Sequence, residues 1–284
     1  MHLVGLAAAL AASALFNLGI VLQALDARVA PPELGYRVAL LARLVRRPRW
    51  MLGFLLGLIG VWPQVIAYAH APFVVVQPAL AVGLLLVLAL GIRVLGESVG
   101  LRDVAGVVAI LGGVALVAWG APQHSDVHRS GASVIAVVAV LAAAGLAPFV
   151  LRGTRLDTGM LAILAAGCGF AATNVATKLV GDDFDLGHAA NVVSWGAVVV
   201  VMGVVATLTN MTAFQRREAT TVVPISTSVQ TFLPILLEPL FLREHWGSAT
   251  HDGIPIVAGL VLALAGNVLL AGTRAVSDLI ADAA

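Results

Sequence analysis

The sequence has little charge, one cysteine and one lysine. Only 11% of its 284 residues are charged, whereas 60% are hydrophobic. A soluble domain usually carries roughly 25% charged residues, so this composition indicates a membrane protein. The single Cys168 excludes an intrachain disulfide and a metal site made of several cysteines. The net charge of +1 gives no indication of nucleic acid or another polyanion as a partner.

Common signatures of catalysis are also missing. The sequence has no Walker loop for a nucleoside triphosphate, no H-E-x-x-H zinc motif and no C-x-x-C pair. We therefore expect no enzymatic activity, no ATP-driven pump and no resident cofactor. His124, Asp126 and His128 alternate in one polar segment. That spacing suits either a metal site in an extended loop or simply a hydrated loop.

Apolar segments long enough to cross a bilayer follow one another along the chain. A spanning helix needs ~20 apolar residues. Only Met1 and His2 precede the first segment, whereas a signal peptide begins with basic residues, so we interpret it as a spanning helix. The predicted fold is all-α, a polytopic bundle of about nine transmembrane helices at 3–25, 50–70, 72–95, 103–119, 131–151, 159–180, 188–208, 219–242 and 253–273.

The basic residues predict the orientation. Cytoplasmic loops are enriched in Lys and Arg, and the longest connection, 26–49, holds six arginines. With this loop inside, the N-terminus lies outside the cell membrane and the C-terminus is cytoplasmic. The outer side then holds only Arg129, Arg243 and Lys178, against thirteen basic residues inside. The inner set is Arg28, Arg37, Arg43, Arg46, Arg47, Arg49, Arg93, Arg102, Arg152, Arg155, Arg216, Arg217 and Arg274.

Two parts of the chain are similar to each other. The segments 73–78 and 219–224 both end in proline, and each opens a helix that ends near a glutamate, Glu97 or Glu244. An internal repeat of this kind points to two copies of one supersecondary unit.

The repeat divides the chain into three parts. We expect 1–119 and 159–284 to be four-helix repeats, joined by the linker helix and loops of 120–158. One extra crossing between the units inverts the second repeat relative to the first. Inverted repeats are typical of secondary transporters, with the substrate at their interface.

The paired prolines and glutamates and the odd helix count resemble the drug/metabolite transporter superfamily. The closer resemblance is to its NIPA-type, magnesium-transporter-like branch, and it covers nearly the whole chain. It is carried by Tyr68-Ala69-His70-Ala71-Pro72, Gly120-Ala121-Pro122 and Thr221-Val222-Val223-Pro224. The resemblance implies a carrier fold and, in that branch, Mg²⁺ as the substrate.

Polar side chains inside the predicted spans mark a candidate site, because each is costly in hydrocarbon unless it is paired or faces water. In the outer half of the bundle they come from five helices at one depth, which favours a substrate cavity. Each one alone would also suit a bond between packed helices. The candidate substrate-binding residues are Gln64, Gln77, Asn174, Lys178, Asn191, Ser194 and Glu238.

Two of these residues carry a charge. Glu238 is the candidate metal ligand, since Mg²⁺ takes oxygen ligands; the alternative is a boundary residue among the outer headgroups. Lys178 is the only lysine, and a buried lysine changes its protonation state more readily than an arginine. We expect Lys178 and Glu238 to interact in one cavity, unless the lysine extends to the outer interface.

Pro78 and Pro224 are candidate gating residues. A proline inside a helix frees the carbonyl four residues earlier, here those of Val74 and Thr220. In a membrane such a carbonyl needs a protein partner or water. These carbonyls would bind a cation or mark gates at opposite faces; a simple kink near a helix end is the alternative.

The sequence thus predicts a secondary transporter that moves a small solute across the bilayer. Mg²⁺ or another divalent cation follows from the family resemblance. A proton-coupled carrier of a small organic metabolite or amphiphile is the alternative, and a membrane scaffold without transport is a third class.

The predicted orientation can be tested by chemical labelling. In a Cys168→Ala background, single cysteines at Ser125 and at Arg46 should react with an impermeant thiol reagent from opposite sides of the membrane. Ser125 should react from outside and Arg46 from the cytoplasm. Labelling of both from one side would contradict the nine-helix arrangement.

Overall fold

The computed structural model describes residues 2–70, 79–97, 99–120, 132–185, 187–242 and 253–281. Every regular element within them is helical, so the all-α prediction is confirmed. A 3₁₀ turn, η1 (Pro32–Leu34), precedes α2, and a π-helical turn, η2 (Gly91–Leu95), continues α5. The α-helices are α1 (His2–Arg28), α2 (Val38–Leu44), α3 (Pro48–His70), α5 (Gly83–Leu90), α6 (Leu101–Gly120), α7 (Ala132–Val150), α8 (Gly159–Asp185), α9 (Ala189–Arg216), α10 (Ala219–Leu242) and α11 (Ile254–Ala281).

Several of these helices are long and apolar enough to cross a membrane. Among the described residues, four stretches of at least 18 residues meet that condition, and Ala79–Leu95 and Ile254–Leu270 are shorter apolar helices. The four are Leu3–Arg28, Ser133–Val150, Gly159–Thr177 and Ala189–Arg216. Large apolar side chains such as Trp62, which is 74% exposed, cover the outside. These features indicate a multi-pass membrane protein in contact with lipid.

Each of the nine predicted apolar segments coincides with a helix over its described part. Some predicted ends are wrong: α8 continues to Asp185 and α9 to Arg216, beyond the predicted ends at 180 and 208. Polar side chains do not end a helix that runs into the headgroup layer, which extends the bilayer beyond its hydrocarbon core. The loop predicted over 26–49 also contains a helix, α2, whose Leu40 and Leu44 are fully buried.

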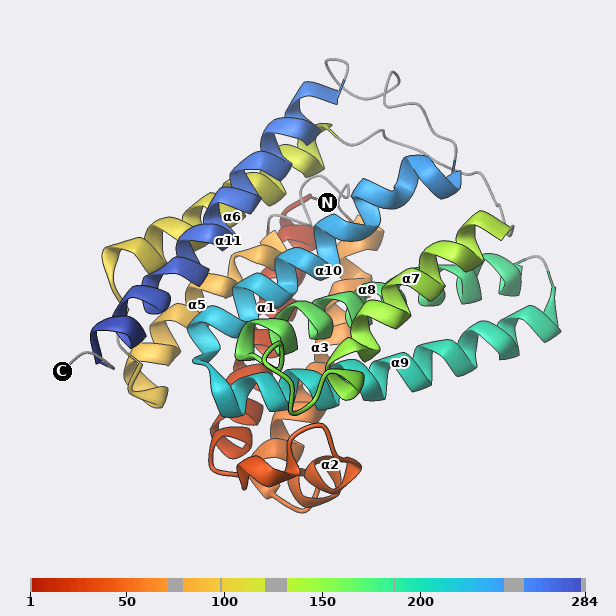
Figure 1. Ribbon diagram of the computed structural model, residues 1–284. Coiled ribbons are helices and arrows are strands. Elements are labelled where there is room, and N and C mark those ends of the chain that lie inside the picture. Colours follow the sequence, from red (N-terminus) through yellow and green to blue (C-terminus); the bar gives the residue numbers. More distant parts are fainter. Residues whose placement is uncertain are drawn as a thin grey trace.

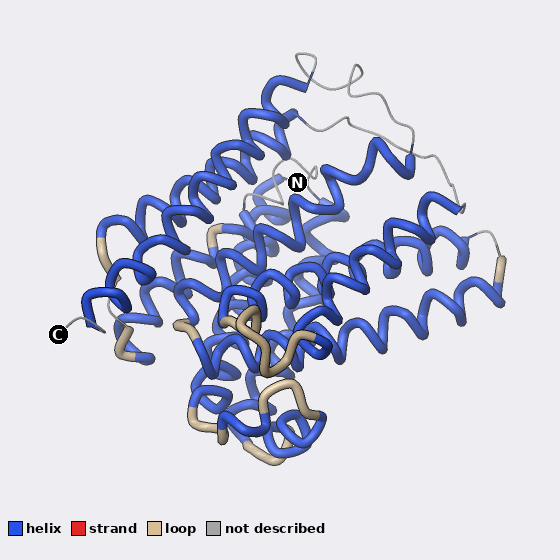
Figure 2. The backbone as a smooth tube through the Cα atoms, viewed as in Figure 1, coloured by secondary structure: helices blue, strands red, loops and turns tan. Residues whose placement is uncertain are grey.

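Figure 1 shows the long helices packed side by side, with consecutive helices running in opposite directions, and Figure 2 shows the described loops between them in tan. The closest pairs are α1 with α3, α8 with α9, and α6 with α11. The helix α7 packs on α8, α9 and α10, so it lies against the C-terminal half. α10 contacts helices of both halves, including α5 and α6.

Three connections meet at one end of the bundle. The side chain of Gln215, at the end of α9, donates to the carbonyls of Ala30 and Pro31 (3.2 and 3.1 Å). Arg152, after α7, donates to the carbonyl of Glu33 (3.4 Å). We call this end, formed by 29–47, 151–158 and the α9–α10 turn, the arginine-rich end.

Glycines allow α6 and α11 to approach backbone to backbone. A Cβ built on Gly113 would lie 2.6 Å from the carbonyl oxygen of Gly259, and a Cβ on Gly266 would lie 2.6 Å from that of Gly106. The pairs 106–266 and 113–259 run in opposite order, so the two helices are antiparallel. Small residues at such contacts are the usual basis of tight helix packing in membranes.

Gly113→Ala tests this packing. Because the added methyl group meets a backbone oxygen that cannot turn away, we expect the free energy of unfolding to fall by about 1–3 kcal/mol. Thermal unfolding in detergent would measure the change. The control is Gly57→Ala in α3, where nothing lies within 4 Å of the added Cβ. That variant should be as stable as wild type or slightly more stable, and equal losses in both variants would contradict the close contact.

Candidate functional site

The predicted substrate-binding residues with described side chains have different surroundings. Asn174 on α8 and Ser194 on α9 are exposed, whereas Gln64 on α3 is half-buried. The hydroxyl of Ser194 donates to the carbonyl of Ala190 in its own helix (2.8 Å). These side chains therefore come from three helices, and no hydrogen bond between them joins the three.

Other predicted residues fall outside what the structure describes. Gln77 and Pro78 lie in an undescribed segment, and the side chains of Lys178 and Glu238 are also undescribed. The interaction predicted between Lys178 and Glu238 stays a prediction. Pro224 is buried in the second turn of α10.

Asn191 takes part in a polar group around Asp183, a residue that sequence reasoning missed. The amide nitrogen of Asn191 donates to the Asp183 carboxylate (3.1 Å), and a ring nitrogen of His188 lies 3.1 Å from the same oxygen. Asp183 is only 4% exposed, and its carbonyl accepts the backbone N–H of His188 (2.9 Å). These contacts fix the turn between α8 and α9, so Asn191 has a structural partner besides its predicted role.

A helix interruption lies near the start of α5. A turn at Val82 separates the helical residues 79–81 from α5. The hydroxyl of Ser13 in α1 donates to the carbonyl of Leu80 and accepts the N–H of Gly83 (2.8 Å). Irregular backbone is tolerated in a membrane only where such partners exist. Ser13 thus replaces the helical hydrogen bonds that the turn disrupts.

A glycine turn at the other end of this segment directs Glu97 towards α10. Gly96 has a left-handed backbone (φ 68°), the conformation that commonly ends a helix at glycine. The N–H of Glu97 then donates to the carbonyl of Gly91 (2.9 Å). The order Leu95-Gly96-Glu97 therefore ends the helix and reverses the chain at the glutamate.

The carboxylate of Glu97 joins three helix ends. Its two oxygens accept the N–H groups of Ala219 (2.8 Å) and Thr220 (2.9 Å), and Arg28 lies 2.8 Å from it. The first N–H groups of a helix have no partner within it, and a negative charge is favourable there. The side chain of Glu97 is 1% exposed and that of Arg28 is 25% exposed. We call these four residues the Glu97 clasp.

Asp26 makes a similar contact between α1 and α3. One carboxylate oxygen accepts the N–H of Trp50 in the first turn of α3 (3.0 Å), and the other lies 3.1 Å from Arg47. The chemistry matches that of the Glu97 clasp. The difference is that Asp26 joins two helices that already pack closely along their length.

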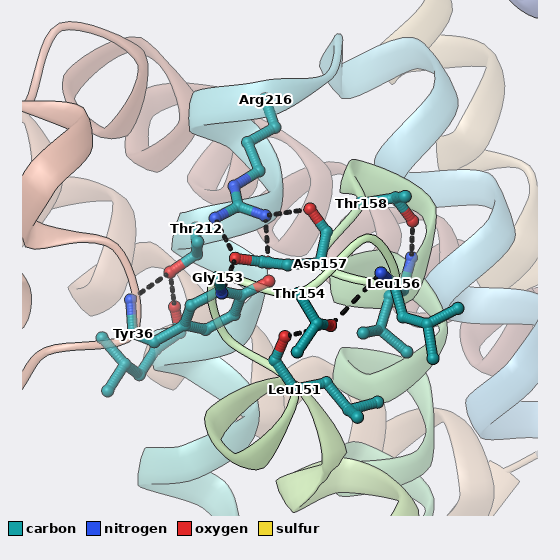
Figure 3. Close-up of polar contacts among 11 residues, drawn as sticks. Tyr36, Leu151, Gly153, Thr154, Leu156, Asp157, Thr158, Thr212 and Arg216 are labelled. Atoms are coloured by element: carbon teal, nitrogen blue, oxygen red, sulfur yellow. Dashed lines mark hydrogen bonds and ion pairs between the residues drawn. The ribbon is translucent and has the colours of Figure 1, made fainter.

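A third polar group holds the 29–37 segment on α9 (Figure 3). The N–H of Tyr36 donates to the hydroxyl of Thr212 (3.0 Å), and Arg216 pairs with Asp157 (2.5 Å) while lying over the Tyr36 ring, 4.9 Å from its centre. The buried Tyr36 hydroxyl lies near the Asp157 carboxylate without the geometry of a hydrogen bond. Burial raises the pKa of Tyr36 to about 12, and the hydrogen bond from Arg216 holds the pKa of Asp157 below its usual range.

An open pocket of about 510 Å³ borders both the Glu97 clasp and the Tyr36 group. Its lining residues are Arg28, Gly159, Phe214, Gln215, Arg216, Arg217 and Glu218. Arg28 is paired with Glu97 and Arg216 with Asp157, and Glu218 supplies a third negative charge beside the third arginine. The local charges cancel, so the pocket has no excess positive charge to hold an anion.

In the described part of the chain, no three His, Cys, Asp or Glu side chains come together to form a metal site. The predicted metal ligand, Glu238, has an undescribed side chain, so that prediction stands as before.

The segment 96–100 has the G-x-S-x-G spacing of a serine-hydrolase nucleophile turn. That motif requires a strand before the serine and a helix after it, whereas here η2 precedes it and α6 follows. The N–H of Gly100 donates to Asp103 (2.8 Å), which caps the start of α6. The spacing therefore belongs to a connection between two helices.

No known family model matches this chain, and no curated protein or solved structure matches it either. The resemblance to drug/metabolite transporters therefore depends on the sequence motifs given above, and what it implies about activity is a proposal.

Asp157→Asn tests the electrostatics of the Tyr36 group. A carboxyl with a lowered pKa binds fewer protons when folded, so its ion pair stabilises the protein above the pKa of an unfolded aspartate, about 3.9. That stabilisation is lost as the pH falls through the lower folded value. We expect the variant to lose about 1 kcal/mol of unfolding free energy at pH 7 and to show a smaller further loss below pH 4.

Melting temperatures in detergent between pH 3 and pH 8 would measure both effects. Glu33→Gln, at an exposed residue of the 29–37 segment that this group holds on α9, is the matched control and should follow the wild-type profile. Identical profiles for all three proteins would contradict the role given to Asp157.

Proposed function

We propose that this chain is a secondary transporter built as two inverted four-helix repeats. The first repeat consists of α1, α3, α5 and α6, the second consists of α8 to α11, and α7 joins them. The symmetry of the helix contacts carries the proposal. α1 packs on α3 as α8 packs on α9, and α1 contacts α5 as α8 contacts α10. α5 contacts α10, and α6 contacts α11. Exchanging the two repeats converts these contacts into one another, whereas the contact of α1 with α9 has no comparable counterpart between α8 and α3.

The glycine contacts follow the same exchange. Adding 153 to positions 106 and 113 gives 259 and 266, so the exchange converts the Gly106–Gly266 pair into the Gly259–Gly113 pair. Because α6 and α11 are antiparallel, the axis that relates them is perpendicular to both. An axis of this kind, lying in the membrane plane, is the one that inverted-topology transporters use.

The positions of Pro224 and of Ala79, the first described residue after Pro78, also support the inversion. Pro224 follows the start of α10, which is held in the Glu97 clasp at the arginine-rich end. Pro78 directly precedes Ala79, which packs with Ala9 and Ala67 near the opposite ends of α1 and α3. Ala79 and the start of α10 thus lie towards opposite ends of the bundle, as an inverted repeat requires, and the depth of Pro78 itself stays a prediction.

We place the arginine-rich end in the cytoplasm, with the N-terminus outside and the C-terminus inside. Arg37, Arg43 and Arg46 are exposed there, and Arg49 is exposed at the adjoining start of α3. Such groups favour the cytoplasmic leaflet, whose anionic lipids attract basic residues next to a span.

The proposed substrate is a small solute, with Mg²⁺ or another divalent cation as the first choice from the family resemblance. The described candidate residues Gln64, Asn174, Asn191 and Ser194 carry neutral amides and a hydroxyl. Such groups suit a partly hydrated cation, but they suit equally the hydrogen bonds of a polar organic metabolite. A proton-coupled organic carrier is therefore the second candidate.

Flux into proteoliposomes tests the proposal. Purified protein should carry either Mg²⁺ or an organic solute from a metabolite panel, while empty liposomes should not. Mg²⁺ flux without proton movement would support the first substrate class, and organic flux coupled to protons would support the second. Absence of flux for every solute, with correctly folded and inserted protein, would contradict the transporter proposal.

Glu238→Gln and Lys178→Ala test the candidate charged pair. Glu238→Gln should nearly abolish flux. If the carrier needs the charge of Glu238 to change conformation, and if that charge interaction contributes ~2–4 kcal/mol, its loss would slow transport by about 30-fold or more. Lys178→Ala should shift the dependence of flux on pH or ion concentration. Glu33→Gln is the control for a charge lost at the arginine-rich end. Wild-type flux in both test variants would mean that the substrate-binding site lies elsewhere in the bundle.

A further inference from the structure

We infer that the Glu97 clasp is the cytoplasmic gate of this transporter, an inference that rests on the proposed function. A carrier with inverted repeats must close one entrance where its repeats meet, and this structure shows the arginine-rich end with such a contact formed. Arg28 and Glu97 belong to the first repeat, whereas Ala219 and Thr220 belong to the second.

The position of the contact separates it from the similar one at Asp26. Asp26 joins α1 to α3 within the first repeat, so it stays intact when the repeats move apart as units. The Glu97 contacts cross from one repeat to the other over 122 and 123 positions of sequence. Relative movement of the repeats at this end must therefore break them.

Burial makes the contact two-state. In the closed form the Glu97 carboxylate is 1% exposed and has two N–H donors and one guanidinium as partners. Drawing α10 away without water would leave two N–H groups without partners and the Glu97 carboxylate with Arg28 as its one remaining partner, which is unfavourable. The contact is thus stable either closed and dry or open and hydrated, and the open form admits water from the cytoplasmic side.

Close packing completes the closure. A Cβ built on Gly91 would lie 2.3 Å from the methyl carbon of Thr220. The backbone of η2 therefore rests directly against the first turn of α10, leaving no passage between them. Of the two charged residues in the clasp, Arg28 is more exposed than Glu97, and it also lines the open pocket. Water therefore reaches the clasp first at Arg28.

A reversible cross-link tests whether this contact must open during transport. In a Cys168→Ser background, Gly91→Cys and Thr220→Cys place two thiols where the backbone of η2 touches the first turn of α10. Because disulfide geometry is specific, formation of the bond is verified before flux is measured. Oxidation should reduce flux by about tenfold or more, the factor expected when a two-state gate is held on one side, and reduction should restore it. For each single-cysteine variant, flux should be the same before and after treatment with the oxidant.

Accessibility of α10 provides a second measurement that does not need a known substrate. A single cysteine at Thr221, which is 4% exposed, is labelled in inside-out vesicles with an impermeant thiol reagent. Glu97→Gln should raise the labelling rate by about tenfold, as expected for loss of charge-assisted hydrogen bonds. Asp26→Asn removes the same chemistry within one repeat and should leave the rate near that of the parent.

These outcomes distinguish a failure of the gate proposal from a failure of the proposed transport function. Unchanged flux after verified disulfide formation overturns the gate while transport stands. Equal labelling in the Glu97→Gln and Asp26→Asn variants also overturns it. If no solute is carried by the parent protein, the proposed function fails, and faster labelling in Glu97→Gln alone would still show that the clasp closes this end of the bundle. Lower flux on oxidation together with selective labelling supports the gate.

Discussion

The first backbone N–H groups of α10 need partners in a place with almost no water, and the buried carboxylate of Glu97 provides them. Around this interaction the end of α1, the end of η2 and the start of α10 take fixed positions. The carboxylate of Asp26, in the last turn of α1, meets the same need for the start of α3, with Arg47 as the paired arginine. At this end of the bundle, carboxylates that cap helix N-termini hold the helices together, whereas apolar contacts hold them together along their sides.

Along the helix sides, glycines at the contacts allow neighbouring helices to pack at short distances. At Gly19 and Gly53, a built Cβ on either residue would lie within about 2.5 Å of the other's carbonyl oxygen. The pair α6 and α11 uses the same device twice. Without a hydrophobic driving force between helices in lipid, such close approach supplies van der Waals contact that larger residues would prevent. The bundle therefore combines tight lateral contacts with a polar closure at one end.

Hydrophobic length predicted the helices well, since a spanning segment must be apolar over its full length. It predicted α2 poorly, because two buried leucines, Leu40 and Leu44, are too few to stand out in an arginine-rich stretch. The Glu97 clasp has no local signal either, since its acceptor and its backbone donors lie more than 120 positions apart. Asn191 shows a further limit: a sequence gives the depth of a residue in the membrane but not its neighbours, and here one neighbour is Asp183.

The glycine contacts between α6 and α11 have a consequence for how the protein is made. The ribosome adds the 145 residues between Gly113 and Gly259, which takes roughly 7–30 s at 5–20 residues per second. During that interval α11 does not yet cover the glycine face of α6. The fold is therefore complete only when the last helix has been made. A chain that stops before α11 leaves the glycine face of α6 uncovered, where the cell's quality control can recognise it.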